Sequence, residues 1–289
     1  MRVKKYDVYG IGNAIVDYEI EVDNAFLRLN GLEKGLMTLA EQDRQGDLLR
    51  TAKSNIRKKQ AGGSVANSIV ALAQLGGKGF YSCKVASDID GLFYTDDLVK
   101  QGVDTNLIDG KLEDGETGKC LVMITPDAER TMSTFLGVSS NFSLSELHLD
   151  QLEDSNYLFL EGYLVSSPTG LGAIKEAKKR AKAAGTQIAL TFSDPSMVKY
   201  FGEQMNEVVG DGIDLLFCNE QEAKLYTGAD NLSQAIDNLK NITKSYVITL
   251  GSNGSEIWDG KNTYYIEAVK TQAVDTTGAG DIYAGAFLY

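Results

Sequence analysis

The segment VDTTGAGDIYAG, Val274–Gly285, places three small residues directly before an aspartate at the expected start of a helix. Glycines at Gly278 and Gly280 allow the backbone N–H groups of Ala279, Gly280 and Asp281 to converge on one point. A helix N-terminus also favours negative charge. The segment therefore predicts an anion-binding turn with Asp281 at its rim. A purely structural interpretation is a tight turn in which the helix dipole stabilises Asp281.

A carboxylate at the rim of an anion site repels the anion unless a hydroxyl group lies between them. Transfer of a phosphoryl group to a hydroxyl supplies that arrangement. The carboxylate accepts the hydroxyl proton while the amides stabilise charge on the transferred group. The residues thus favour Asp281 as a general base.

A second glycine segment, AGGSVANSIVALAQLGG, begins at Ala61 and leads into an amphipathic helix. Adjacent Gly62 and Gly63 let a ligand approach the backbone closely. The Asn67 side chain can donate to a hydroxyl and accept from one. The structural alternative is a helix with Ser64 as its N-cap. Taken alone, the segment leaves both interpretations open.

The chain pattern predicts an α/β fold with a small β lid. From about residue 155, short apolar runs alternate with helical stretches, as in a parallel sheet covered by helices. AIVDYEIEV instead alternates apolar and polar residues, like a strand with one solvated face, and GKCLVMIT and RTMSTFLG flank the turn PDAE like a hairpin. We expect a single domain over residues 1–289, with a core of residues 1–13, 41–115 and 138–289 and a lid of roughly residues 14–40 and 116–137.

Composition narrows the class of protein. The net charge of -12 disfavours nucleic acid as a partner. No apolar run reaches the ~20 residues of a membrane span, and the N-terminus lacks a signal-peptide pattern, so we expect a cytoplasmic protein without a membrane partner. Cys83, Cys120 and Cys218 lie in separate apolar runs, which favours buried reduced thiols. Because His148 is the only histidine, a Ser-His-Asp hydrolase and a histidine-ligated metal site are nearly excluded.

The segment GIGNAI contains Gly10 and Gly12 after an expected strand, as in a dinucleotide-binding turn. However, Ile15 occupies the position of the third glycine, and a strand follows instead of a helix. The segment therefore argues against a nicotinamide-dependent oxidoreductase.

Together, GGSVANS and DTTGAGDIYAGAFL resemble the two signatures of the PfkB, or ribokinase-like, family of carbohydrate and nucleoside kinases. Their order and spacing match, and GNAIVDYE, TPDAERTM and EGYL resemble its adenosine-kinase-like branch. The resemblance implies a ribokinase-like α/β fold whose central, mostly parallel sheet is covered by helices. It also implies transfer of the γ-phosphate of ATP, with Mg²⁺, to a primary hydroxyl of a nucleoside or sugar. A non-catalytic protein that binds a nucleoside or sugar is the alternative.

The resemblance implies roles for single residues on the acceptor side. Asp17 is similar to the lid aspartate that binds sugar hydroxyls, and Asp281 is similar to the catalytic base. Arg130 follows the hairpin turn and is expected to approach the phosphates when the lid closes. The remaining implied positions are the pocket residues Asn13, Gly62, Gly63 and Asn67 and the anion-hole residues Gly278, Ala279 and Gly280.

On the donor side, CNEQEAKLYTG resembles the family's Asn-x-x-Glu segment, with Asn219 beside ATP and Glu222 beside Mg²⁺, through water. Its structural alternative is a helix start with Asn219 as N-cap. TLGSNGSEIW resembles the strand and glycine turn that contact ATP, at Thr249, Gly251 and Gly254.

Two departures from the family pattern stand out. Ile282 and Tyr283 replace a small residue and a phenylalanine after the catalytic position. Family members also continue beyond Tyr289 with helices that close the adenine side and order a monovalent-cation loop, so the chain is expected to lack them.

Vicinal-diol recognition by Asp17 suits several acceptors, and the choice depends on lid-side residues such as Leu36, Met37 and Tyr163. Both a monomer and a homodimer fit the sequence.

Overall fold

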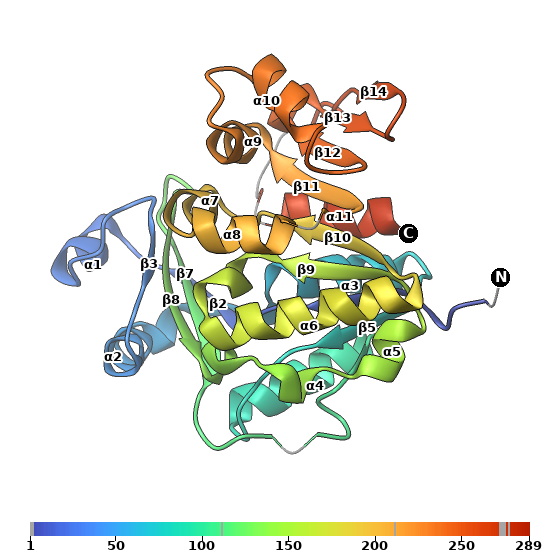
Figure 1. The fold of residues 1–289 in the computed structure, drawn as a ribbon. Helices are drawn as coiled ribbons and strands as arrows, with labels where there is room; N and C mark the ends of the chain where they lie inside the picture. The colour runs from blue at the N-terminus through green and yellow to red at the C-terminus, as the bar shows by residue number, and fades with distance from the viewer. Residues whose placement is uncertain (1–2, 111, 211, 272–275, 277) are drawn as a thin grey trace.

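The computed structural model describes residues 3–110, 112–210, 212–271, 276 and 278–289 (Figure 1). Val274, Asp275 and Thr277 of the C-terminal glycine segment lie outside the described residues. Of the helices described, none is long and apolar enough to cross a membrane.

A nine-stranded sheet forms the centre of the molecule, in the order β14-β13-β12-β11-β10-β9-β1-β5-β6. The strands from β6 to β12 run parallel, as the sequence predicts, and β13 and β14 extend the sheet in antiparallel fashion. Their bounds are β1 Tyr6–Ile11, β5 Gly79–Ser82, β6 Asp104–Thr105, β9 Ser155–Glu161, β10 Gln187–Thr191, β11 Leu215–Asn219, β12 Tyr246–Thr249, β13 Ser255–Trp258 and β14 Thr263–Ile266.

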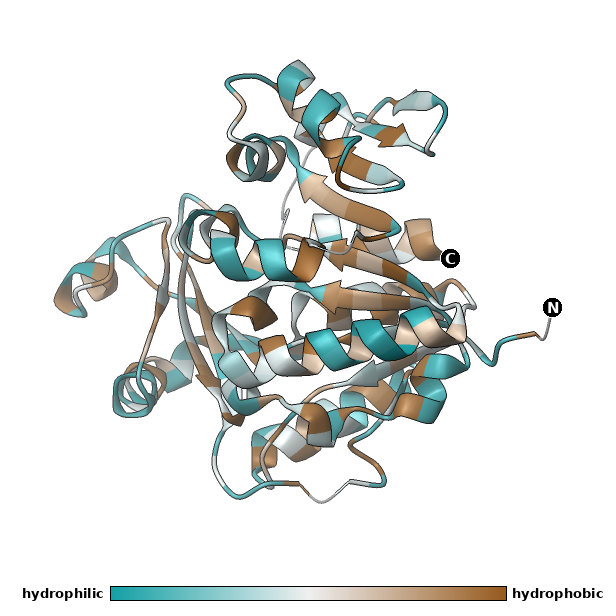
Figure 2. Cartoon of the chain, viewed as in Figure 1, coloured by the Kyte–Doolittle hydropathy of each residue, from teal (hydrophilic) through white to brown (hydrophobic). Residues whose placement is uncertain are grey.

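Helices cover both faces of this sheet (Figure 1). One hydrophobic cluster packs beneath α5 Leu149–Glu153, α6 Pro168–Ala184, α7 Pro195–Tyr200, α8 Gly202–Val209, α9 Glu220–Thr227 and α10 Leu232–Leu239. A second lies beneath α3 Ser64–Gln74, α4 Ile89–Lys100 and α11 Ala279–Leu288. In β1, Tyr9 and Ile11 belong to the first cluster and Val8 to the second, because successive strand residues point to opposite faces. Figure 2 shows the resulting apolar strands between helices with polar outer faces.

The lid is a separate five-stranded sheet in the order β3-β8-β7-β2-β4. Its strands are β2 Ile15–Glu21, β3 Met37–Leu39, β4 Ile56–Gly62, β7 Thr117–Ile124 and β8 Arg130–Gly137, accompanied by α1 Asn24–Leu29 and α2 Gln42–Ala52. The predicted hairpin is confirmed, because β7 and β8 pair antiparallel. Short 3-10 turns span Lys53–Asn55, Val138–Asn141, Leu144–Glu146, Gly162–Ser166 and Gly251–Asn253.

Strand β4 corrects the predicted boundary of the lid. The sequence pattern places residues 56–62 in the core, whereas the structure pairs them antiparallel with β2. Consecutive polar residues from Arg57 to Gln60 hide the alternation that marks a half-buried strand. The strand forms because its backbone pairs with β2, and its own side-chain pattern does not predict it.

The two faces of β2 differ as the alternation predicts. Val16, Tyr18 and Ile20 are buried in the second hydrophobic cluster. Asp17 and Glu19 lie on the opposite face. On that face the register aligns Asp17 with Cys120 of β7 and, through it, with Thr134 of β8. All three cysteines are buried free thiols, as predicted.

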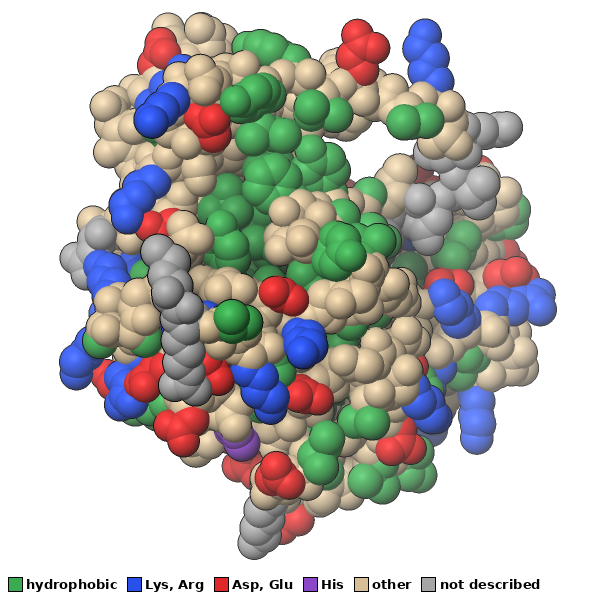
Figure 3. Space-filling view, turned by 90° about the vertical axis from the view of Figure 1, so that its right-hand side faces the viewer, with side chains coloured by type: hydrophobic (Ala, Val, Ile, Leu, Met, Phe, Trp, Pro, Cys, Tyr) green, Lys and Arg blue, Asp and Glu red, His purple; other side chains and the backbone are tan. Residues whose placement is uncertain are grey.

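Hydrophobic side chains also gather on the surface near the C-terminus (Figure 3). Among the hydrophobic residues near the C-terminus and in β14, Ile266 is 50% exposed and Tyr289 is 66% exposed. Every residue of β14 is exposed. This end of the large sheet is therefore less covered than its centre.

Candidate active site

Most of the predicted site residues lie at or near the carboxyl ends of the parallel strands. The register aligns Glu161 at the end of β9 with Thr191 of β10, and Asn219 of β11 with Thr249 of β12. Asn13 follows β1, the neighbour of β9. Ligands of open α/β sheets bind beyond this edge. The topology thus gathers residues that are far apart in the sequence into one candidate site.

Asp281 lies in the first turn of α11 and is held by the first turn of α3. Its Oδ1 accepts a hydrogen bond from Ser64 Oγ at 2.7 Å, and its Oδ2 accepts one from Asn67 Nδ2 at 3.0 Å. Ser68 Oγ donates to the Asp281 backbone oxygen at 2.8 Å. Burial raises the pKa of Asp281, and the hydrogen bonds from Asn67 and Ser64 oppose that rise. The two glycine segments therefore meet at one carboxylate.

This meeting requires α3 and α11 to approach closely. A Cβ atom added to Gly285 would lie 2.2 Å from the Ser68 backbone oxygen and 3.0 Å from Ala71 Cβ. Glycine at this position therefore sets the spacing at which Ser64 and Asn67 reach Asp281.

The turn before α11 has the geometry expected for an anion site, with one difference. Gly278 is the N-cap and has a φ of 71°. The Ala279 N–H donates to the Thr276 oxygen within the turn, at 3.2 Å. The amides of Gly280 and Asp281 belong to a first helical turn, whose N–H groups have no acceptor within the helix. The Ala279 amide is therefore engaged within the turn, and the anion hole stays a prediction that centres on the amides of Gly280 and Asp281.

The double glycine makes close contacts with the lid and with the loop after β1. Gly63 has a φ of 113°, and a Cβ atom there would lie 2.3 Å from the Asn13 backbone oxygen. A Cβ atom on Gly62 would lie 2.3 Å from Asp17 Oδ2. The N-cap of α3 is Gly63 rather than Ser64. Because Ser64 lies inside the helix, its hydroxyl is directed to Asp281.

Asn13 is buried and its side chain is engaged by protein groups. Its Nδ2 donates to Glu161 Oε1 at 3.0 Å, and its Oδ1 accepts from Ser139 Oγ at 3.0 Å. Each of these two atoms can form a further hydrogen bond, so the role of Asn13 in binding substrate stays a prediction. These contacts also link the loop after β1 to Glu161 and Ser139.

Glu161 is a residue whose importance the sequence signals only weakly, through the segment EGYL. It is 1% exposed and accepts hydrogen bonds from the backbone N–H groups of Asn13 and Val65, each at 3.1 Å. Burial raises the pKa of Glu161 to about 7, although these hydrogen bonds oppose the rise. Glu161 thereby ties the loop after β1 to the start of α3.

Asp17 places a second carboxylate near Asp281 from the lid. Burial raises the pKa of Asp17 to about 7, with further contributions from the charges of Glu19 and Asp281. The lid and the core meet at this site, because a Cβ atom on Gly62 would lie 2.3 Å from Asp17 Oδ2 and Ser64, two residues later, donates to Asp281. The structure therefore brings together Asp17, Gly62, Asn67 and Asp281, as predicted.

On the donor side, Asn219 and Glu222 form a capping box at the start of α9. Asn219 Oδ1 accepts from the Glu222 N–H at 2.9 Å, and Glu222 Oε2 accepts from the Asn219 N–H at 2.8 Å. The structural interpretation of this segment is thus confirmed. Burial raises the pKa of Glu222 to about 7, and the charges of Asp194 and Asp281 add to the rise. These carboxylates create a negative region that a cation would neutralise.

Within the described ranges, no group of three or more His, Cys, Asp and Glu side chains could hold a metal ion directly. Mg²⁺ usually keeps several waters and needs only one or two carboxylates beside the phosphates. The expected place of Glu222 beside Mg²⁺, through water, stays a prediction.

The glycine turn after β12 depends on backbone conformations that favour glycine. Gly251 and Gly254 have φ values of 59° and 92°. A Cβ atom on Gly254 would lie 1.9 Å from the Ile266 backbone oxygen. Thr249 precedes this turn and is adjacent to Asn219 in the sheet. The three predicted donor-side positions thus lie beside the Asn219 segment.

Arg130 lies apart from the other predicted residues. In β8, Arg130 pairs with Ile124 of β7. Thr134, which is aligned with Asp17 across the lid sheet, lies four residues further along β8. Four residues of a strand span about 13 Å. The expected approach of Arg130 to the phosphates stays a prediction that requires the lid to move.

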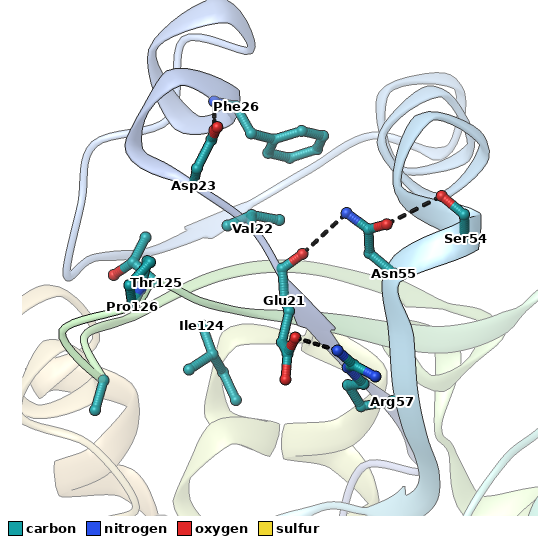
Figure 4. A pocket seen from close by; sticks show the side chains of 11 residues that line it. Glu21, Val22, Asp23, Phe26, Ser54, Asn55, Arg57, Ile124, Thr125 and Pro126 are labelled. Atoms are coloured by element: carbon teal, nitrogen blue, oxygen red, sulfur yellow. Dashed lines mark hydrogen bonds and ion pairs between the residues drawn. The ribbon is translucent and has the colours of Figure 1, made fainter.

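A large cavity of about 940 Å³ also lies away from Asp281, at the far end of the lid (Figure 4). Its lining includes Glu21, which forms an ion pair with Arg57. Glu21 is four residues beyond Asp17 in β2. This cavity is therefore separate from the candidate active site.

Comparisons with known proteins show the family of this chain. The model of the family described as "pfkB family carbohydrate kinase" matches residues 39–289. A ribokinase from Staphylococcus aureus is 25% identical, covering 87% of this chain and 81% of its own, and an adenosine kinase from Schizosaccharomyces pombe is 24% identical, covering 99% and 88%.

Solved structures are similar along nearly the whole chain. A probable sugar kinase from Rhizobium etli has a TM-score of 0.89 and 31% identity, covering 99% of this chain and 86% of that one. An adenosine kinase from Sinorhizobium meliloti has a TM-score of 0.88 and 35% identity, covering 98% and 86%.

Proposed function

Because the chain belongs to the pfkB family of carbohydrate kinases and is an ATP-dependent sugar or nucleoside kinase, we propose that its acceptor is a nucleoside. The prediction of a phosphotransferase with a hydroxyl acceptor is confirmed, as is the ribokinase-like fold.

The lid surface beside Asp17 supports a nucleoside acceptor. The next row on the same face joins Glu19 to Val122, Met132 and Met37 across four strands. Val122 is buried in this row, whereas Met132 is partly exposed and Met37 is 36% exposed, so two apolar side chains continue the surface beyond the diol-binding carboxylate. A free sugar offers few apolar faces, whereas the face of a nucleobase packs well on such side chains. The Sinorhizobium relative of 35% identity, an adenosine kinase, points the same way.

The two aspartates have different roles toward the acceptor. Ionised Asp17 accepts hydrogen bonds from two vicinal ribose hydroxyls and so orients the hydroxymethyl group. Asp281 accepts the proton of the hydroxymethyl oxygen as that oxygen attacks the γ-phosphorus and the bond to ADP breaks. The amides of Gly280 and Asp281 stabilise charge on the transferred group. Thr249, Gly251, Gly254 and Asn219 are proposed to hold ATP.

Glu222 and Asp194 are proposed to hold Mg²⁺ through water. The ion supplies neutralisation of phosphate charge. Raised pKa values at buried carboxylates are common where a bound cation or a catalytic step offsets their cost. A monovalent-cation requirement stays a prediction from the family resemblance.

The acceptor is tested by ADP release from Mg-ATP with adenosine, inosine, guanosine, cytidine, ribose and fructose, each alone. We expect turnover with a nucleoside and little with free ribose or fructose. Asp17→Asn should raise the acceptor KM, because the amide accepts fewer hydrogen bonds, and should leave the ATP KM unchanged. Selective turnover of a free sugar would overturn the nucleoside assignment while leaving the kinase intact.

The Ser64 hydroxyl is expected to tune the base. Its hydrogen bond to Asp281 Oδ1 favours the ionised carboxylate, so Ser64→Ala should raise the pKa of Asp281 further. The acidic limb of the pH profile of kcat/KM should then move to higher pH. Ser68→Ala is the matched control, because Ser68 donates to the Asp281 backbone oxygen instead. Equal shifts in the two variants would contradict this role.

A further inference from the structure

Tyr283 connects the helix of Asp281 to the glycine turn after β12. Its hydroxyl oxygen lies 2.7 Å from Ser255 Oγ, and either group can donate. Ser255 is 2% exposed and begins β13 directly after Gly254. Tyr283 follows Asp281 by two residues in α11. One hydrogen bond thus joins the acceptor side of the site to the donor side.

The start of α11 is consequently held from two directions. On one side, Ser64, Asn67 and Ser68 of α3 donate to Asp281. On the other, Ser255 meets the Tyr283 hydroxyl. Ser255 is aligned with Thr249 across the turn, and the Leu250 N–H donates to the Gly254 oxygen at 2.8 Å. A shift of Ser255 would therefore move the whole turn from Thr249 to Gly254.

We propose that Tyr283 and Ser255 are a positioning pair that fixes the turn Gly251–Gly254 relative to Asp281. The inference rests on the proposed function of this turn in holding ATP. Phosphoryl transfer depends on alignment of the attacking oxygen with the γ-phosphorus. A direct link between the base helix and the ATP turn maintains that alignment without touching either substrate. It also gives a role to Tyr283, where the family pattern has phenylalanine.

The pair is tested by Tyr283→Phe, Ser255→Ala and the double variant. Each single variant should raise the ATP KM about three- to tenfold, the worth of one hydrogen bond, and leave the acceptor KM unchanged. The double variant should be no worse than either single variant, because both remove the same interaction. Tyr6→Phe is the matched control, because Tyr6 donates to Asp104 Oδ2 over the same 2.7 Å at the far side of the sheet.

Melting temperatures of all four variants distinguish a loss of positioning at the ATP turn from a general loss of folding stability. The control should lose stability like Tyr283→Phe and keep the wild-type ATP KM. Additive effects in the double variant, or an unchanged ATP KM in all variants, would overturn the proposal. A non-additive rise confined to the acceptor KM would instead overturn the assignment of the turn to ATP, on which the inference rests.

Discussion

Replacement of Asp281 by asparagine is expected to lower kcat about 10²- to 10⁴-fold, the range that a positioned general base contributes. Asparagine has nearly the same shape, and its oxygen can still accept the Ser64 hydrogen bond. Its amide cannot take up the proton of the acceptor hydroxyl. Because burial raises the pKa of Asp281, the natural carboxylate is also a stronger base than an exposed one.

The fold should survive this change. The Asn67 side chain, whose Nδ2 now donates to Asp281 Oδ2, can rotate to present its oxygen to the new amide. ATP affinity and melting temperature are therefore expected to match those of the wild type. Asp96→Asn, an exposed change in α4, serves as the control and should keep full turnover. Wild-type turnover in Asp281→Asn would exclude Asp281 as the base.

The sequence was sufficient for the centre of the site because the chemistry there depends on glycine. A turn that lets backbone amides meet an anion needs residues without Cβ atoms, and such glycines can be identified directly in the sequence. Gly63 and Gly278, both with positive φ, are of this kind. The alternating strand around Asp17 was likewise visible, because only one of its faces is buried.

Contacts between distant segments were not visible in the sequence. Glu161 reads as an ordinary strand-end glutamate until β9 and β1 become neighbours and bring it to Asn13 and Val65. The same contact engages the Asn13 side chain, whose role toward the substrate stays a prediction from the family resemblance. Strand β4 lacks an apolar alternation of its own and forms through pairing with β2. In each case a partner supplies the information that the local pattern lacks.

Gly285→Ala should reduce both stability and turnover, because the added methyl group would meet the Ser68 backbone oxygen at 2.2 Å. Relief requires α11 to move away from α3, and overpacking of this kind costs about 1–3 kcal/mol. Asp281 is one helical turn earlier and would move with the helix, away from Ser64 and Asn67. A displacement of about 1 Å in such a site can cost roughly 10²-fold in rate.

The same substitution at Gly172 in α6 provides a control of opposite sign. Gly172 is exposed, and a Cβ atom there meets no heavy atom within 4 Å. Alanine should therefore stabilise the helix by about 0.5–1 kcal/mol and leave kcat unchanged. Denaturant unfolding and steady-state kinetics on both variants measure the two effects. If Gly285→Ala loses stability but keeps the wild-type kcat, the spacing of α3 and α11 does not control Asp281, and the base must be positioned by the turn at Gly278 alone.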